Sequence, residues 1–211
     1  MRNIITIILS AFCVVFLSSC AEKKAEKEAV AKPPNIIFIM SDDHTTQGLG
    51  VYGSRLASLN PTPNLDQLAN EGMLFENCFV NNSIGVPSRA AIITGQRAQR
   101  NGVIDLEGFL APEQQYLPIE MKKLGYQTAI VGKWHLQKEP AAFDYYKVLP
   151  VQGKYFNHEF RVRGEKAWPS NVVETEGHST DVITEIALDL LESKRKADQP
   201  FFLMHHFKAP H

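Results

Sequence analysis

Runs of apolar residues of strand length alternate along this chain with segments of helical pattern. Residues 35–40 (Asn-Ile-Ile-Phe-Ile-Met) are a continuous β-branched and aromatic run, which is typical of a strand buried on both faces of a parallel sheet. Three further runs predict strands at residues 73–80, 126–132 and 201–204. The predicted helices and the candidate site residues are located relative to these four strands.

Helical segments lie between the predicted strands. Thr62 as N-cap, Pro63 at the first helical position and Gly72 just past the end delimit a short helix. A second helix is predicted over residues 115–124, and the strongest helical periodicity covers residues 179–196. Strands alternating with helices predict a three-layer α/β/α domain with a mostly parallel central sheet.

One stretch, residues 83–95, combines a turn with features that favour anion binding. It predicts a strand end, a tight turn, and a short helix that opens on Pro87-Ser88-Arg89 and closes on Gly95. The N–H groups at a helix N-terminus favour an anion, and the Arg89 guanidinium on the first turn adds donors suited to a tetrahedral oxyanion. The alternative is an ordinary connection with a surface arginine.

Polar residues follow each predicted strand, where ligands of parallel sheets gather. They are Ser41-Asp42-Asp43-His44, Asn81-Asn82, Gly132-Lys133-Trp134-His135 and the stretch 205–211. Adjacent carboxylates repel each other unless a cation or hydrogen bonds compensate, and Ca²⁺ or Mg²⁺ is the natural partner of oxygen ligands. Asp42 and Asp43 are therefore candidate metal ligands; the alternative is a solvated turn with a helix N-cap.

The stretch 83–95 resembles the signature of the type I sulfatases, in the alkaline phosphatase superfamily: Cys (or Ser)-x-Pro-x-Arg, then a short helix ending Thr-Gly. In that family the cysteine is oxidised to formylglycine, whose hydrated aldehyde attacks the sulfur of a sulfate ester. Val86-Pro87-Ser88-Arg89 and Thr94-Gly95 fit, but Gly85 stands at the nucleophile position and has no β-carbon to oxidise. Ser83 and Ser88 flank Gly85 from different places on the turn.

The resemblance assigns roles to the other motifs as well. It implies that Asp42 and Asp43 are two metal ligands and that Arg89 belongs to the catalytic set. Lys133 would contact the sulfate oxygens, and His135 would lie near the formylglycine hydroxyl. Pro210-His211 resembles the family's Pro-His-x-Pro, whose histidine contacts the leaving group as general acid. His205 and His206 are interpreted as packing or substrate-edge residues.

The expected function is that of a formylglycine-dependent sulfuric ester hydrolase acting on sulfated carbohydrate, with Ca²⁺ or Mg²⁺ as cofactor. The alternative is a catalytically dead pseudosulfatase that binds sulfated glycans through the same metal and anion rim. A phosphatase or phosphonate hydrolase is disfavoured because it needs Thr, Ser or Cys at position 85. The loop 141–164 is a candidate substrate wall or a subdomain packing element. The resemblance covers residues 35–211 and predicts the N-terminal part of a catalytic domain, truncated at its C-terminal side.

Composition and the N-terminal residues bear on location. The 22 Lys and Arg balance 23 Asp and Glu, and no basic block argues for nucleic acid. Residues 1–19 match a lipoprotein signal peptide, because an apolar run shorter than a membrane span ends in Leu17-Ser18-Ser19-Cys20. Cys20 would carry lipid, and residues 20–34 form a charged tether. We expect a protein of the bacterial cell envelope, lipid-anchored in the periplasm or at the surface. Cys78 would then be the only thiol in the body, and it is predicted to be buried.

Overall fold

The computed structural model describes residues 32–211, and Pro33–His211 form one compact unit. The predicted signal peptide, the lipid-anchored Cys20 and most of the tether lie outside the described residues. Within residues 32–211, no helix combines the length and apolar character needed to cross a membrane.

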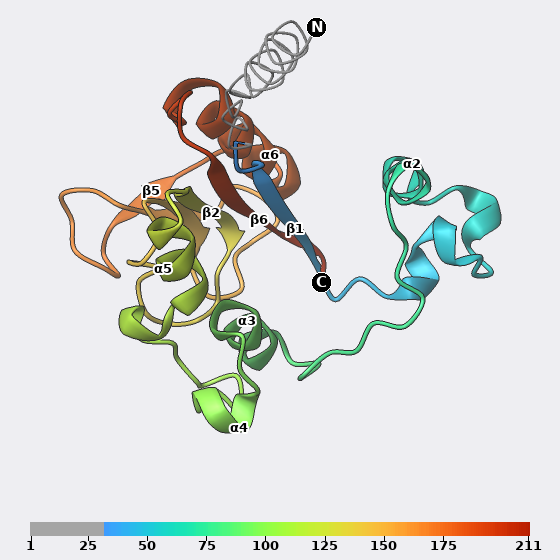
Figure 1. Ribbon diagram of the computed structural model, residues 1–211, viewed down its shortest axis with the longest axis horizontal. Coiled ribbons are helices and arrows are strands. Elements are labelled where there is room, and N and C mark those ends of the chain that lie inside the picture. The colour runs from blue at the N-terminus through green and yellow to red at the C-terminus, as the bar shows by residue number, and fades with distance from the viewer. Residues whose placement is uncertain (1–31) are drawn as a thin grey trace, which may run out of the picture. The chain divides into compact units, whose positions relative to one another are not determined.

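A six-stranded sheet forms the centre of this unit (Figure 1), in the order β1-β6-β2-β3-β4-β5. The first four strands in this order are parallel to one another, whereas β4 pairs antiparallel with both β3 and β5. The strands are β1 Ile36–Asp42, β2 Gln127–Lys133, β3 Tyr145–Leu149, β4 Glu159–Val162, β5 Val172–Glu174 and β6 Phe201–Pro210. The prediction of a mostly parallel sheet is confirmed.

The predicted helices are present. The α-helices are α2 Pro63–Glu71, α3 Gly85–Thr94, α4 Ala98–Asn101, α5 Tyr116–Lys123 and α6 Ser179–Asp189, and α6 continues as a π-helical turn over Leu190–Lys194. Short 3₁₀ turns lie at Thr46–Gly48, Gly50–Tyr52, Ala57–Leu59 and Pro112–Gln114. Thr62 precedes α2 as predicted, but its hydroxyl bonds Gly50 N and Asp66 rather than capping the helix.

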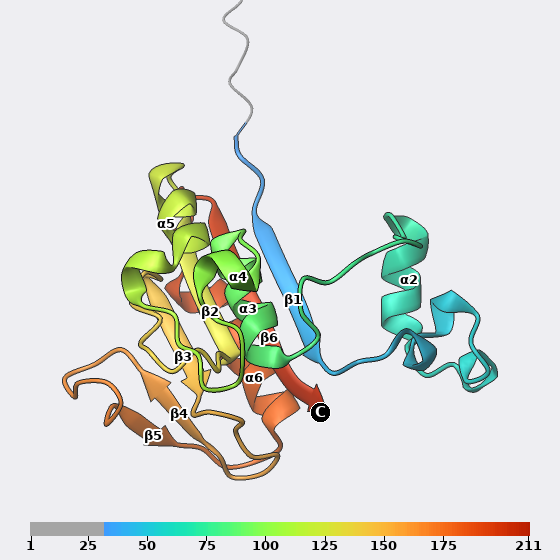
Figure 2. The same ribbon diagram turned by 90° about the horizontal axis from the view of Figure 1, so that it is seen from below.

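Two apolar clusters cover the two faces of the sheet. Ile130 of β2 packs with Val86, Ala90 and Ile93 of α3, and α5 adds partly buried side chains. The neighbouring positions of β2 point to the other face and pack on α6. Figure 2 shows α3 and α6 on opposite sides of the sheet. The three-layer prediction is therefore confirmed.

The prediction that the first strand is buried on both faces is wrong. β1 pairs only with β6 and lies at an edge of the sheet. Its residues belong to neither apolar cluster, and Ile39 is 57% exposed. An apolar run indicates that a segment can be buried, but it does not show which element, if any, packs over it.

Further predictions need correction. Residues 73–80 form no strand, because no neighbouring strand pairs with them, and Cys78 is exposed rather than buried. The helix of the 83–95 stretch begins at Gly85, so Arg89 lies in its second turn. The last strand starts at Phe201 as predicted and runs to Pro210. The loop 141–164 contains β3 and β4, so the sheet occupies part of the predicted substrate wall.

Candidate functional site

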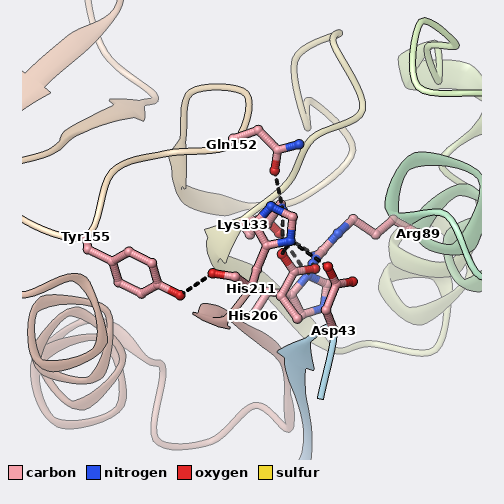
Figure 3. Close-up of polar contacts among 8 residues, drawn as sticks. Asp43, Arg89, Lys133, Gln152, Tyr155, His206 and His211 are labelled. Carbon is pink, nitrogen blue, oxygen red and sulfur yellow. Dashed lines mark hydrogen bonds and ion pairs between the residues drawn. The ribbon is translucent and has the colours of Figure 1, made fainter. Parts of the chain in front are cut away.

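Three adjacent strands and one helix deliver the predicted site residues to the same sheet edge. Asp42 ends β1, Lys133 ends β2, and the C-terminal half of β6 lies between them, since Met40 and Gly132 both pair with His206. Arg89 approaches from α3, as Figure 3 shows. The carboxyl ends of parallel strands meet at one edge, which explains why residues so far apart in the chain converge.

The centre of the site is a buried group of two cations on one carboxylate. Arg89 Nη2 donates to Asp42 Oδ1 at 3.0 Å, and Lys133 Nζ forms an ion pair with Asp42 Oδ2. Arg89 is 3% exposed, so the surface-arginine alternative is wrong. Burial acts to raise the pKa of Asp42, but the hydrogen bond from Lys133 and the charge of Arg89 outweigh it and lower that pKa. The Asp42 carboxylate is therefore ionised.

Gly132 allows the backbones of β2 and β6 to meet behind this group. Its φ is 98°, and a β-carbon there would lie 1.8 Å from the carbonyl oxygen of His206. No residue with a side chain fits that position. The glycine of the Gly-Lys-Trp-His motif thus places Lys133 next to β6.

His135 is buried just past Lys133, with a left-handed backbone (φ 56°). Burial, followed by the charges of Lys133 and Arg89, lowers its pKa to about 4. Its Nδ1 has no hydrogen-bond partner among the described residues. At neutral pH this imidazole is uncharged, and it can accept a hydrogen bond.

His211 lies at the open side of the site. Its Nδ1 is 2.5 Å from Asp43 Oδ2, and its carbonyl oxygen accepts a hydrogen bond from Tyr155 Oη at 2.6 Å. Asp43 is exposed, with a positive φ of 55°. Both contacts of His211 hold it beside the Arg89–Asp42–Lys133 group (Figure 3).

A cavity of about 330 Å³ lies between the end of β1 and the start of α3. Asp42, Asp43, Arg89, Gly85 and Ser88 are among its lining residues. A β-carbon built on Gly85 would have no atom within 4 Å, and the backbone there is not left-handed. The nucleophile position of the motif therefore faces open space and tolerates a side chain.

The two predicted metal ligands are close together but differ in their surroundings. Both oxygens of Asp42 bind protein cations, whereas Asp43 contacts His211. Across residues 32–211, no group of three or more His, Cys, Asp or Glu side chains is arranged to hold a metal ion. The carboxylates are the right donor type for a hard cation, and this part of the chain supplies two of them.

Sequence reasoning missed the role of His206 and the presence of Gln152. His206 Nδ1 lies 3.1 Å from Arg89 Nη1 and 3.1 Å from the carbonyl oxygen of Lys133, so it accepts from the guanidinium in one tautomer and donates to the carbonyl in the other. Burial, then the charge of Arg89, lowers the His206 pKa to about 3, which keeps the ring neutral. Gln152 Oε1 accepts from Lys133 Nζ at 2.6 Å. His205 lies on the other face of β6, where its ring is 4.4 Å from that of Phe207, centroid to centroid.

Comparisons with known proteins show which family this chain is similar to. The sulfatase family model matches residues 34–211. N-acetylglucosamine-6-O-sulfatase of Bacteroides thetaiotaomicron is 42% identical over 207 residues, which are 97% of this chain and 35% of that protein. N-acetylgalactosamine-6-sulfatase of Rattus norvegicus is 32% identical over 212 residues, with 85% and 40% covered.

A solved structure described as BT4656 in complex with its substrate D-glucosamine-2-N,6-O-disulfate superposes with a TM-score of 0.78 at 43% identity. The match covers 85% of this chain and 35% of that one. The chain thus spans between a third and two-fifths of the length of the curated relatives named here.

Proposed function

Since this chain belongs to the sulfatase family, we propose that its site is that of a sulfuric ester hydrolase for sulfated carbohydrate. The observation that carries the proposal is the convergence of Arg89 and Lys133, both buried, beside a cavity that starts at the nucleophile position. Two fixed cations in a water-poor site suit a tetrahedral oxyanion. The sulfated glucosamine in the BT4656 complex supports a sulfated amino sugar as the substrate class.

The proposed role of each side chain follows from its charge and its contacts. Arg89 and Lys133 bind the sulfate oxygens. His211 carries out proton transfer to the leaving group from Nε2, since Asp43 engages its Nδ1. The family resemblance assigns His135 a hydrogen bond to a group on residue 85, and its lowered pKa keeps the ring neutral for that role.

Formylglycine does not fit this chain, because Gly85 has no β-carbon that could be oxidised. Position 85 therefore provides no nucleophile, and we derive no hydrolytic step through it. This observation favours a second function for the chain as it stands: a pseudosulfatase that binds sulfated glycans without cleaving them. The same cationic site supports both functions, and position 85 separates them.

Calorimetry combined with a sulfate assay tests the proposal on the protein expressed from its complete reading frame. With Ca²⁺ present, we expect glucosamine 6-sulfate to bind with a Kd on the order of micromolar or tighter. No sulfate should appear in the same sample. Absence of binding heat would remove both functions, and sulfate release by the Gly85 protein would remove the binding-only function.

We further propose that Asp42 and Asp43 are two ligands of a divalent cation, Ca²⁺ or Mg²⁺, which would polarise the sulfate group. Ca²⁺ titration in the absence of sugar should show saturable binding. Asp43→Asn should weaken it about tenfold or more, because Ca²⁺ affinity follows the number of charged ligands. Asp198→Asn, at an exposed site after α6, is the matched control. Equal affinities in the two variants would exclude Asp43 as a ligand.

The location that we propose is the bacterial cell envelope. A lipidated Cys20 would tether the protein in the bacterial cell envelope, on the side where sulfated polysaccharides are met.

A further inference from the structure

The connection between β3 and β4, residues 150–158, leaves the sheet beside the candidate site. Lys133 at the end of β2 pairs with Leu149 at the end of β3. The connection therefore starts at the carboxyl edge, where ligands of such sheets bind. Val151 and Asn157 both have positive φ values, 46° and 47°. A β-branched residue in this conformation is strained, and such strain is concentrated at functional segments.

Gln152 joins this connection to the sulfate-binding cations. Its Oε1 accepts from Lys133 Nζ at 2.6 Å (Figure 3). An ammonium group only donates, so the amide oxygen must face Lys133. The amide NH₂ is then directed elsewhere, and it has no acceptor among the described residues.

A second cavity, of about 240 Å³, lies on this connection. Pro150, Gln152, Lys154, His158 and Glu159 are among its lining residues. His158 is 1% exposed, and neither of its ring nitrogens has a hydrogen-bond partner among the described residues. Leaving both polar atoms of a buried ring unpaired is costly, and such a group calls for an explanation such as a ligand.

The charges of the cavity favour a neutral ligand. Burial, followed by the charges of His178 and Lys147, lowers the pKa of His158, so the ring is uncharged at neutral pH. It then offers one donor and one acceptor, which match a hydroxyl group. Lys154 and Glu159 carry opposite charges, so their fields offset each other. Pro150 and Val151 add apolar surface for the C–H face of a sugar.

We propose that this second cavity is a saccharide subsite, which binds the ring hydroxyls of the sugar whose sulfate group lies at Arg89 and Lys133. The inference rests on the proposed function, and it extends that function from the sulfate group to the sugar. Gln152 links the two parts: its oxygen fixes Lys133, and its NH₂ donates to the sugar. His158 provides the buried donor and acceptor.

The test compares two ligands, inorganic sulfate and glucosamine 6-sulfate, by calorimetry on the complete protein. The unaltered protein should bind the sugar ester more tightly than inorganic sulfate. His158→Leu should weaken glucosamine 6-sulfate about tenfold and leave inorganic sulfate unchanged. Because Leu replaces unpaired polar atoms with apolar ones, the melting temperature should hold or rise. If His158 had only a structural role, His158→Leu would lower the melting temperature and would not weaken binding of the sugar ester selectively.

Two further variants complete the design. His205→Leu makes the same change at a buried histidine that lines neither cavity, and it should leave both affinities unchanged. Lys154→Met alters an exposed residue that lines the second cavity, and it should weaken binding of the sugar ester alone, by about threefold. If His158→Leu does not fold, this variant tests the proposed subsite in its place.

The outcomes separate the two proposals. If glucosamine 6-sulfate does not bind the unaltered protein, the proposed function fails and the subsite fails with it. If it binds no more tightly than inorganic sulfate, the subsite alone is overturned. The same holds if folded His158→Leu and Lys154→Met keep the full preference for the sugar, or lose both ligands equally.

Discussion

Sulfate release should appear when Gly85 is replaced by cysteine in the complete protein, expressed in a host that makes formylglycine. The gain over the Gly85 protein should be on the order of a million-fold in turnover, the scale on which loss of a nucleophile disables a catalytic unit. The structure accommodates the new side chain, since a β-carbon at position 85 meets no atom within 4 Å. Arg89 lines the same cavity as Gly85, and Lys133 and His211 both contact Asp42, the partner of Arg89.

Two control variants test whether the activity depends on an oxidisable side chain at position 85. Gly85→Ala adds the β-carbon without an oxidisable group and should remain inactive. Ser88→Cys places a cysteine on the same cavity but one turn further along α3, and it should also be inactive. Mass spectrometry must show that position 85 is modified. A modified protein that releases no sulfate from any of a broad panel of sulfated sugars would contradict the assignment as a hydrolase.

The second large effect is expected for Arg89→Ala. This change removes the partner of a buried carboxylate, and breaking such a pair typically costs about 3–5 kcal/mol of folding free energy. Arg89 also donates to the carbonyl oxygen of Lys133 at 2.9 Å and lies 3.1 Å from His206 Nδ1, so both residues would lose a contact. Urea unfolding should show the lower stability, and calorimetry should show no binding of glucosamine 6-sulfate.

Arg89→Lys should rescue little, because an ammonium group cannot reproduce the fork that contacts Asp42, Lys133 and His206 together. The matched control is Lys122→Met, which breaks an exposed 3.0 Å pair with Asp144. Exposed pairs contribute at most about 1 kcal/mol. An Arg89→Ala protein as stable as this control would show that the buried group does not hold the fold together.

The sequence predicted those features that depend on local pattern. β2 and α6 are covered on the faces that their apolar residues indicate, so their periodicity was sufficient. Asp42, Lys133 and His211 converge because each lies at the carboxyl end of one of three adjacent parallel strands. Arg89 was found through its motif, but its burial was not, because burial depends on which elements pack over the helix.

Features that depend on neighbours escaped prediction. Residues 73–80 have the composition of a strand, yet pairing decides whether a strand forms, and no strand in the described part of the chain pairs with them. His205 and His206 were interpreted together as packing or substrate-edge residues; extending the strand alternation two residues past Met204 would have indicated opposite faces for them. Gln152 lies in a connection without a motif, and only the register of β3 against β2 places it beside Lys133.

The open edge of β1 has a practical consequence for every binding experiment on a chain of this length. A long apolar strand with one unpaired edge is a template for association with a second copy. Here Ile39 is 57% exposed and Phe79, in the unpaired 73–80 segment, is 91% exposed. Aggregates formed in this way would present many sulfate sites at once and would bind a long sulfated polymer by avidity. Monosaccharide esters at low protein concentration therefore report the true affinity of one site, and polysaccharide pull-downs do not.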